Sequence, residues 1–229
     1  MSVAISKSTL KFLKDLAQNN NRPWFNDHKD RYAAAHENMI EFAEALIDEM
    51  SHHDNLVPMT GKKSLMRIYR DVRFSKDKSP YKKNFGGGLK RATKWLRGGY
   101  YYHIEPGQCF VGGGFWKPNP ADLKRIRDEI AADDKTLRKI IASSSFKKTF
   151  GELQGETVKT APKGFAKDHP AIDLLRHKQF LISRSFTDKE ATSPDFLKEV
   201  VQSFRNMRPF FDYMSEVLTT DANGVPIED

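Results

Sequence analysis

The chain has 229 residues, 38% of them hydrophobic and 11% aromatic, a composition that is typical of one folded domain over residues 1–229 and excludes intrinsic disorder. The single cysteine, Cys109, excludes an intramolecular disulfide and indicates a reducing compartment. The sequence has neither a signal peptide nor a run of about 18 apolar residues, which excludes a membrane partner and favours the cytoplasm. The net charge is +8, but residues 62–97 hold thirteen lysines and arginines against two aspartates, so this segment carries +11 and the remainder −3, which excludes uniform basicity.

The first 50 residues predict two helices and a short connection. Apolar residues fall on one stripe of a helix over residues 8–20, with Ser8 as its N-cap. Residues 22–25 are expected to be a connection whose two aromatic side chains enter the core. A long helix follows over residues 27–50, because apolar side chains recur along one of its faces.

The middle of the chain changes to the alternation of apolar and polar residues that is typical of strands. Residues 65–74 are predicted to form a strand with one buried face, which Arg70 interrupts. The side chains expected on that buried face are Met66, Ile68, Val72 and Phe74. Further strands are predicted over residues 84–89, 99–105, 108–115 and 179–186. Pro106 and Gly107 occupy the central positions of a type II turn, so the strands on either side of them form a hairpin.

Helices return in the C-terminal half. The segments expected are a helix over 120–132, shorter helical pieces over 135–150, a short strand near 157–160 and a short helix over 169–177. A closing helix is predicted over residues 193–218, with Ser193 as N-cap and Pro194 in its first turn, followed by a frayed tail over 219–229. This order predicts an α+β fold with a mainly antiparallel sheet of about five strands, packed with helices from both ends of the chain.

The segment from Arg67 to Lys82 is the candidate binding site. Two arginines beside one carboxylate on the polar face of the predicted strand can bind an anion, while Asp71 orients one guanidinium group. The local positive charge therefore favours a phosphate- or carboxylate-bearing ligand. A ladder of Arg–Asp pairs across neighbouring strands is the alternative without a binding function. The expected ligand contacts are Arg67, Arg70, Asp71, Arg73, Lys78, Tyr81 and Lys82, with Tyr81 supplying a hydroxyl group.

Three residues are candidates for acid–base catalysis: His103, Tyr81 and Asp77. His103 shares a strand face with Tyr101 and Glu105, and histidine titrates near neutral pH, as a general base requires. A structural histidine at the core or the sheet edge, without a functional role, is the favoured interpretation of His103. No reaction type is indicated, so the sequence leaves open whether the protein is an enzyme.

No motif indicates a cofactor or a metal site. The seven histidines are scattered, and the triple-glycine runs at residues 86–88 and 112–114 lack the spacing of a dinucleotide-binding loop. These glycines are expected to bend strands, although a close approach by another part of the chain is the alternative. Cys109 lies in an apolar stretch and is interpreted as a small buried hydrophobic residue.

Residues 90–97 interleave four cations with Trp95 and suggest a second partner class. Phosphate contacts and base stacking by this segment would extend the basic surface into a non-specific nucleic-acid-binding site. A solvated connection with Trp95 folded inward is the alternative. A third hypothesis is a protein-interaction module that docks an acidic partner on the basic face.

Two stretches of the sequence resemble a known family. The first stretch comprises Phe12-Leu13-x-x-Leu16, Asn19-Asn20, Arg22-x-Trp24-Phe25-x-x-His28-Lys29 and Tyr32. The second stretch, residues 67–82, reads Arg-Ile-Tyr-Arg-Asp-Val-Arg-Phe-Ser-Lys-Asp-Lys-Ser-Pro-Tyr-Lys. Together with the C-terminal Pro209-Phe210-Phe211-x-x-Met214, they are similar to the family called domain of unknown function 2461. The resemblance spans about residues 8–218 and implies one whole-chain domain without an assigned activity. It carries over no catalytic residue.

Overall fold

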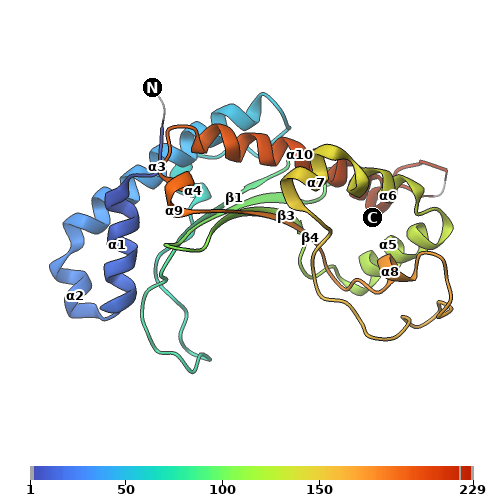
Figure 1. The fold of residues 1–229 in the computed structure, drawn as a ribbon, viewed down its shortest axis with the longest axis horizontal. Coiled ribbons are helices and arrows are strands. Elements are labelled where there is room, and N and C mark those ends of the chain that lie inside the picture. Colours follow the sequence, from blue (N-terminus) through green and yellow to red (C-terminus); the bar gives the residue numbers. More distant parts are fainter. Residues whose placement is uncertain (1–2, 222, 228–229) are drawn as a thin grey trace. The chain divides into compact units, whose positions relative to one another are not determined.

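The computed structural model describes residues 3–221 and 223–227 and has the α+β architecture that the sequence predicts. The chain divides into two compact units. The first unit consists of Met1–Leu89, Tyr101–Val111 and Ser185–Gln202, and the second of Lys90–Tyr100, Gly112–Arg184 and Ser203–Asp229. Among the described residues there are ten helices and one antiparallel sheet of four strands, in the order β1-β2-β3-β4 (Figure 1).

The four strands are those predicted from the alternation downstream of residue 83. They are β1 (Phe85–Lys90), β2 (Gly99–Ile104), β3 (Cys109–Phe115) and β4 (Phe180–Phe186). The turn between β2 and β3 is confirmed, because the backbone N–H of Gln108 donates to the Glu105 carbonyl at 2.9 Å. Gly107 has a φ of 77°, the positive value that the third position of a type II turn requires.

Among the described residues, five helices lie wholly in the first unit, and α1 packs against α3 (Figure 1). They are α1 (Lys7–Gln18), α2 (Arg22–Asp27), α3 (Lys29–Ser51), α4 (Gly61–Ser64) and α9 (Asp188–Ala191). The predicted N-cap was wrong by two residues: Ser6, in an extended conformation, accepts from the N–H of Thr9, and this places Ser8 inside the helix. Residues 22–25 are helical and not a plain connection, because the Asn21 side chain caps α2.

Large aromatic and aliphatic side chains form the core of the first unit. Phe42 of α3 contacts Tyr102 edge-to-face at 5.9 Å and stacks on Phe196 at 5.5 Å, both distances between ring centroids. Phe12 and Leu16 of α1 are buried with them. Because each fully buried side chain of this size contributes about 1.5–3 kcal/mol, this core accounts for much of the stability of the unit.

The second unit contains α5 (Pro120–Ala132), α6 (Lys135–Ala142), α7 (Ser144–Phe150), α8 (Ile172–Leu175) and most of α10 (Phe196–Thr219). The predicted bounds of α5 are confirmed, since Asn119 caps it and Pro120 opens its first turn. The strand expected near residues 157–160 reduces to one bridge, between Thr157 and His177. Ser193 does not cap α10; its hydroxyl accepts from the N–H of Asp195 in the turn before the helix.

The strand predicted over residues 65–74 is absent, so the sheet has four strands and not five. Two isolated bridges involve this segment among the described residues. One pairs Leu65 with Gly87 of β1, and the other pairs Tyr69 with Tyr81, which lies further along the same loop. Within the described residues, the segment therefore pairs with the sheet at Leu65, and it then folds back on itself between Tyr69 and Tyr81. No packing layer covers its apolar side: Met66 is half-exposed and the Phe74 side chain is 96% exposed, although Ile68 is buried.

The triple glycines permit close approaches of neighbouring groups. A Cβ atom on Gly87 would overlap the ring and hydroxyl of Tyr102. A Cβ on Gly113 would lie 2.5 Å from the carbonyl oxygen of Gly99 and 2.6 Å from the ring of Phe211. The expectation that these glycines mainly bend strands was therefore wrong at both positions, where the lack of a side chain makes room for a neighbour.

Candidate functional site

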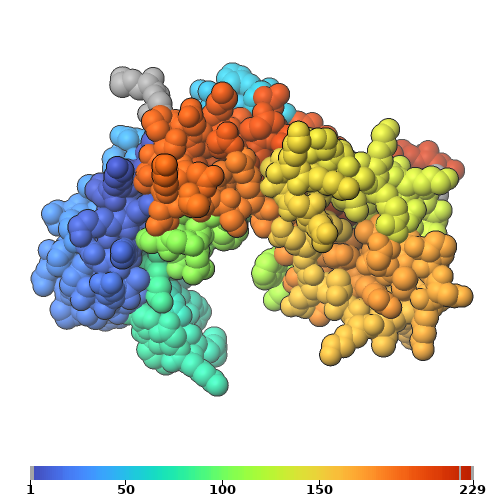
Figure 2. Space-filling model, in the orientation of Figure 1, coloured from blue at the N-terminus to red at the C-terminus, as the bar shows by residue number. Residues whose placement is uncertain are grey.

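Residues 65–83, here called the basic loop, project from the helices of the first unit (teal in Figure 2). Two hydrogen bonds flank the Tyr69–Tyr81 bridge: Arg70 N–H donates to the Pro80 carbonyl at 2.9 Å, and Lys82 N–H donates to the Ile68 carbonyl at 2.7 Å. This pattern makes Tyr69 and Tyr81 a non-hydrogen-bonded pair, whose side chains approach closely. Their ring centroids are 5.5 Å apart.

Arg70 holds the loop closed. Its Nη1 contacts the Asp77 carboxylate at 2.5 Å, the Ser79 carbonyl at 3.1 Å and the Ser79 hydroxyl at 2.8 Å. The hydroxyl and N–H of Ser79, with Arg70, hold the pKa of Asp77 far below its usual range. The Asp77 carboxylate is thus engaged by Arg70 and Ser79 within the loop.

Asp71 pairs with Arg73, as the sequence suggested for one of the two arginines. Arg73 Nε and Nη2 contact the two oxygens of Asp71 at 3.0 and 2.7 Å, and this bidentate pair lowers the pKa of Asp71. Lys78 donates to the Val72 carbonyl at 3.0 Å. The Arg–Asp pairs thus lie within the loop and do not form a ladder between strands. These ion pairs engage Arg70 and Arg73 with Asp77 and Asp71, the two acidic residues of the segment.

Arg67 and Lys82 are the two predicted ligand contacts that keep their charges available. Neither side chain makes a hydrogen bond or ion pair to any of the residues 3–221 and 223–227. Burial lowers the pKa of Lys82, and the nearby charge of Arg67 lowers it further. The exposed Arg22 of α2 lies close enough to Tyr81 to act on the pKa of its hydroxyl. Three cations of the first unit therefore surround the bridge in the loop.

Tyr81 is not a freely exposed hydroxyl group, contrary to the role expected of it. Its ring is buried and stacks on Phe25 at 4.0 Å with 14° between the planes. Burial raises the pKa of Tyr81, and the neighbouring Tyr69 raises it further. Tyr69, by contrast, is half-exposed, and it also raises the pKa of Tyr32.

A second polar cluster surrounds His103 on β2. The Nε2 atom of the ring lies 2.9 Å from the Glu105 carboxylate, and Nδ1 lies 3.0 Å from the Tyr101 hydroxyl and 3.4 Å from the Asn84 amide nitrogen. These distances fit a neutral ring that donates from Nε2 and accepts at Nδ1. The strand alternation thus placed His103, Tyr101 and Glu105 together as expected. A pocket of about 380 Å³ adjoins Glu105 and Lys83.

Residues 90–97 are largely structural. The Arg91 side chain is buried and forms an ion pair with Asp212, and Arg97 contacts Asp122 at 2.5 Å. Trp95 is exposed, with the Lys94 ammonium 4.6 Å from its ring centroid, so the expectation of an inward-folded indole was wrong. Half of the cations assigned to a nucleic-acid surface here are engaged within the second unit.

Cys109 is a buried thiol, as its apolar neighbours suggested. Burial raises its pKa to about 11, so the reactive thiolate is scarce at neutral pH.

Among the residues described, no helix is long and apolar enough to cross a membrane.

Comparison with known proteins gives one match. The profile of the conserved hypothetical protein family DUF2461 aligns with residues 8–213, nearly the whole chain. The chain belongs to this family. The matched range includes the basic loop and the His103 cluster. No curated protein and no solved structure matches the chain.

Proposed function

We propose that this DUF2461 protein binds a phosphate- or carboxylate-bearing ligand between Arg67 and Lys82. The observation that supports the proposal is the juxtaposition of these two cations, neither of which has an acidic partner among the described residues. Two like charges side by side destabilise each other until an anion lies between them. Binding of that anion would also reverse the lowered pKa of Lys82.

The surroundings of this pair suit an anion with an organic part. Arg67 can engage two oxygens of a phosphate or carboxylate at once, whereas Lys82 acts as a point charge. Tyr69 offers a hydroxyl group and a half-exposed ring beside them. Arg70 and Asp77 keep the loop closed, so the two cations are held in place before the ligand arrives. Preorganisation of this kind reduces the entropy lost on binding.

The proposal is tested by calorimetric titration of the protein with inorganic phosphate, nucleotides and dicarboxylates. A charge-assisted hydrogen bond contributes about 1.5–3 kcal/mol, so Arg67→Ala or Lys82→Ala should weaken binding about 10- to 150-fold. The matched control is Lys76→Ala, which removes an exposed charge of the same loop and should leave the affinity nearly unchanged. Equal affinity of all three variants for every anion would exclude a site at this pair.

Nucleic-acid binding is a second candidate, favoured by the side chain at the tip of the loop. Phe74 is 96% exposed, and the Arg73 guanidinium lies 5.9 Å from its ring centroid. Exposed aromatic rings beside cations stack on unpaired bases. This function predicts affinity for single-stranded oligonucleotides that falls steeply with salt and is weakened by Phe74→Ala. A small-anion site predicts a weaker salt dependence and no effect of that substitution.

Two broader inferences accompany this proposal. We infer a single functional domain, since the family match runs through segments of both compact units. We also infer a reducing compartment such as the cytoplasm, because Cys109 is a buried thiol. A catalytic role, with His103 as the base, stays an open extension of the anion site.

A further inference from the structure

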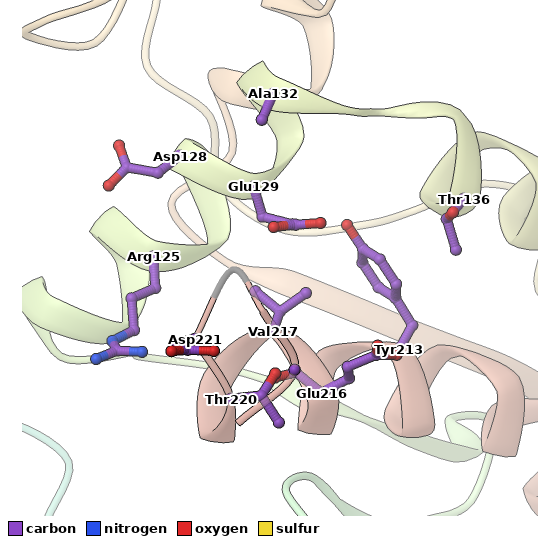
Figure 3. Close-up of a pocket in the computed structure, with 11 residues that line it drawn as sticks. Arg125, Asp128, Glu129, Ala132, Thr136, Tyr213, Glu216, Val217, Thr220 and Asp221 are labelled. Carbon is purple, nitrogen blue, oxygen red and sulfur yellow. The ribbon is translucent and has the colours of Figure 1, made fainter. Parts of the chain in front are cut away.

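A separate pocket of about 450 Å³ lies in the second unit, lined by α5, the end of α10 and the residues that follow it (Figure 3). This volume is within the range of small-molecule sites in proteins. Its walls combine apolar surface from Ala132 and Val217 with acidic side chains from both helices. Four carboxylates and one arginine line it, so the pocket is strongly negative although the protein as a whole carries +8.

Two of the four carboxylates are already engaged. Asp128 contacts Lys124 at 2.5 Å, and Asp221 accepts from the N–H groups of Asn223 and Val225. Glu129 of α5 and Glu216 of α10 differ from them. Neither has a cationic partner or a side-chain hydrogen bond among residues 3–221 and 223–227. Glu129 and Glu216 therefore carry the negative charge of the pocket that no cation of the described residues neutralises.

Tyr213 supplies an independent sign of a ligand. Its side chain projects from α10 toward Glu129 in the pocket (Figure 3), only 8% of the residue is exposed, and its hydroxyl oxygen has no hydrogen-bond partner among the described residues. Burial raises the pKa of this hydroxyl, and the carboxylates of Glu129 and Glu216 are among the charges that raise it further. A buried hydroxyl without a partner costs about 1–3 kcal/mol, so such groups are rare unless they serve a ligand.

We propose that this pocket binds a small organic cation that carries a primary ammonium group. The ammonium lies between Glu129 and Glu216, donates to both carboxylates and donates its third proton to the Tyr213 hydroxyl oxygen. Three donors on a primary ammonium match these three acceptors. The alkyl part of the ligand lies along Ala132 and Val217.

A metal ion fits this donor set poorly. Nowhere in the described part of the chain do three or more His, Cys, Asp or Glu side chains come close enough together to hold one ion. Carboxylates that are spread around a pocket with apolar walls suit an organic cation, whose charge is accompanied by apolar surface. The ligand carries the opposite charge to the one proposed for Arg67 and Lys82, so the two sites are independent.

The test is a titration with n-butylammonium chloride, with 1-butanol and sodium chloride at matched concentrations as reference ligands. We expect the ammonium salt alone to give saturable binding and to raise the melting temperature. Glu129→Gln and Glu216→Gln keep the side-chain shape but remove one charge, and each should weaken binding about tenfold or more. Glu152→Gln removes an exposed carboxylate of the same unit and serves as the matched control.

Tyr213→Phe separates a ligand contact from a structural role. Because the hydroxyl has no partner in the described part of the chain, its removal should leave the unliganded melting temperature unchanged or slightly raised, while binding of n-butylammonium weakens. The proposal is overturned if the ammonium salt binds no better than 1-butanol. It is also overturned if the two glutamine variants and the phenylalanine variant bind as tightly as Glu152→Gln does.

Discussion

Replacing Asp212 by asparagine removes the acidic partner of a fully buried arginine. The Arg91 side chain is 0% exposed and forms an ion pair with Asp212. Its Nη1 also donates to the Arg97 carbonyl at 3.1 Å and lies 3.3 Å from the Ser215 hydroxyl. An asparagine keeps the shape of the site but removes the negative charge of the ion pair with Arg91, so the folded state becomes less stable.

The size of the effect follows from the burial of the pair. Removing one partner of a buried ion pair costs about 3–5 kcal/mol. Asp212 is half-exposed and Arg91 keeps its other two contacts, so the lower end, about 3 kcal/mol, applies. For a chain of this length, that loss corresponds to a fall in melting temperature of about 6–12 °C.

Differential scanning calorimetry of three variants tests the reasoning. Asp122→Asn breaks the Arg97–Asp122 pair, but Arg97 is 33% exposed, so this control should cost no more than about 1 kcal/mol. Arg91→Met combined with Asp212→Asn should be more stable than Asp212→Asn alone, because the double variant also removes the buried positive charge. If Asp212→Asn and Asp122→Asn lowered the melting temperature equally, burial of Arg91 would not be the cause and the argument would fail.

Three further outcomes are expected. Gly113→Ala should destabilise the protein by about 1–3 kcal/mol in denaturant unfolding, since the added Cβ overlaps backbone and ring atoms; an unchanged midpoint would contradict this. Cys109 should resist thiol-labelling reagents at pH 7 until the protein unfolds, because burial raises its pKa to about 11, and rapid labelling of the native protein would disprove it. Burial lowers the pKa of His177 below its unfolded value, so its contribution to stability is present above about pH 6.5 and lost as the pH falls. His177→Gln should therefore lose less melting temperature than the wild type between pH 7.5 and 5.5, and parallel curves would refute that.

Local signals predicted much of the fold. The bounds of α5 follow from Asn119 and Pro120, and the hairpin follows from Gly107. These features depend on residues next to each other in the chain, so the sequence contains their cause. The predicted strand over residues 65–74 failed because alternation indicates two faces but not what covers them. No layer covers the Phe74 side, and the backbone pairs within its own loop.

The candidate sites divide in the same way. The Asp71–Arg73 pair and the grouping of His103 with Tyr101 and Glu105 join residues two positions apart, and these were anticipated. The burial of Tyr81 depends on Phe25, far away in the sequence, and could not be anticipated. The 450 Å³ pocket of the second unit could not be predicted from the sequence, because it forms where α5 and α10 converge. Packing there leaves the Tyr213 hydroxyl without a hydrogen-bond partner among the described residues.

The close approach of Gly87 to Tyr102 has a consequence for the evolution of the family. The Tyr102 hydroxyl lies 3.2 Å from that of Ser64 and fills the space that a side chain at position 87 would need. A larger residue at 87 becomes acceptable only after the residue at 102 shrinks, and the Ser64 hydroxyl then loses its contact with residue 102 while it keeps its hydrogen bond to the Gly61 carbonyl. Substitutions at these three positions should therefore be inherited together, and an alignment of DUF2461 sequences should display them as covarying columns.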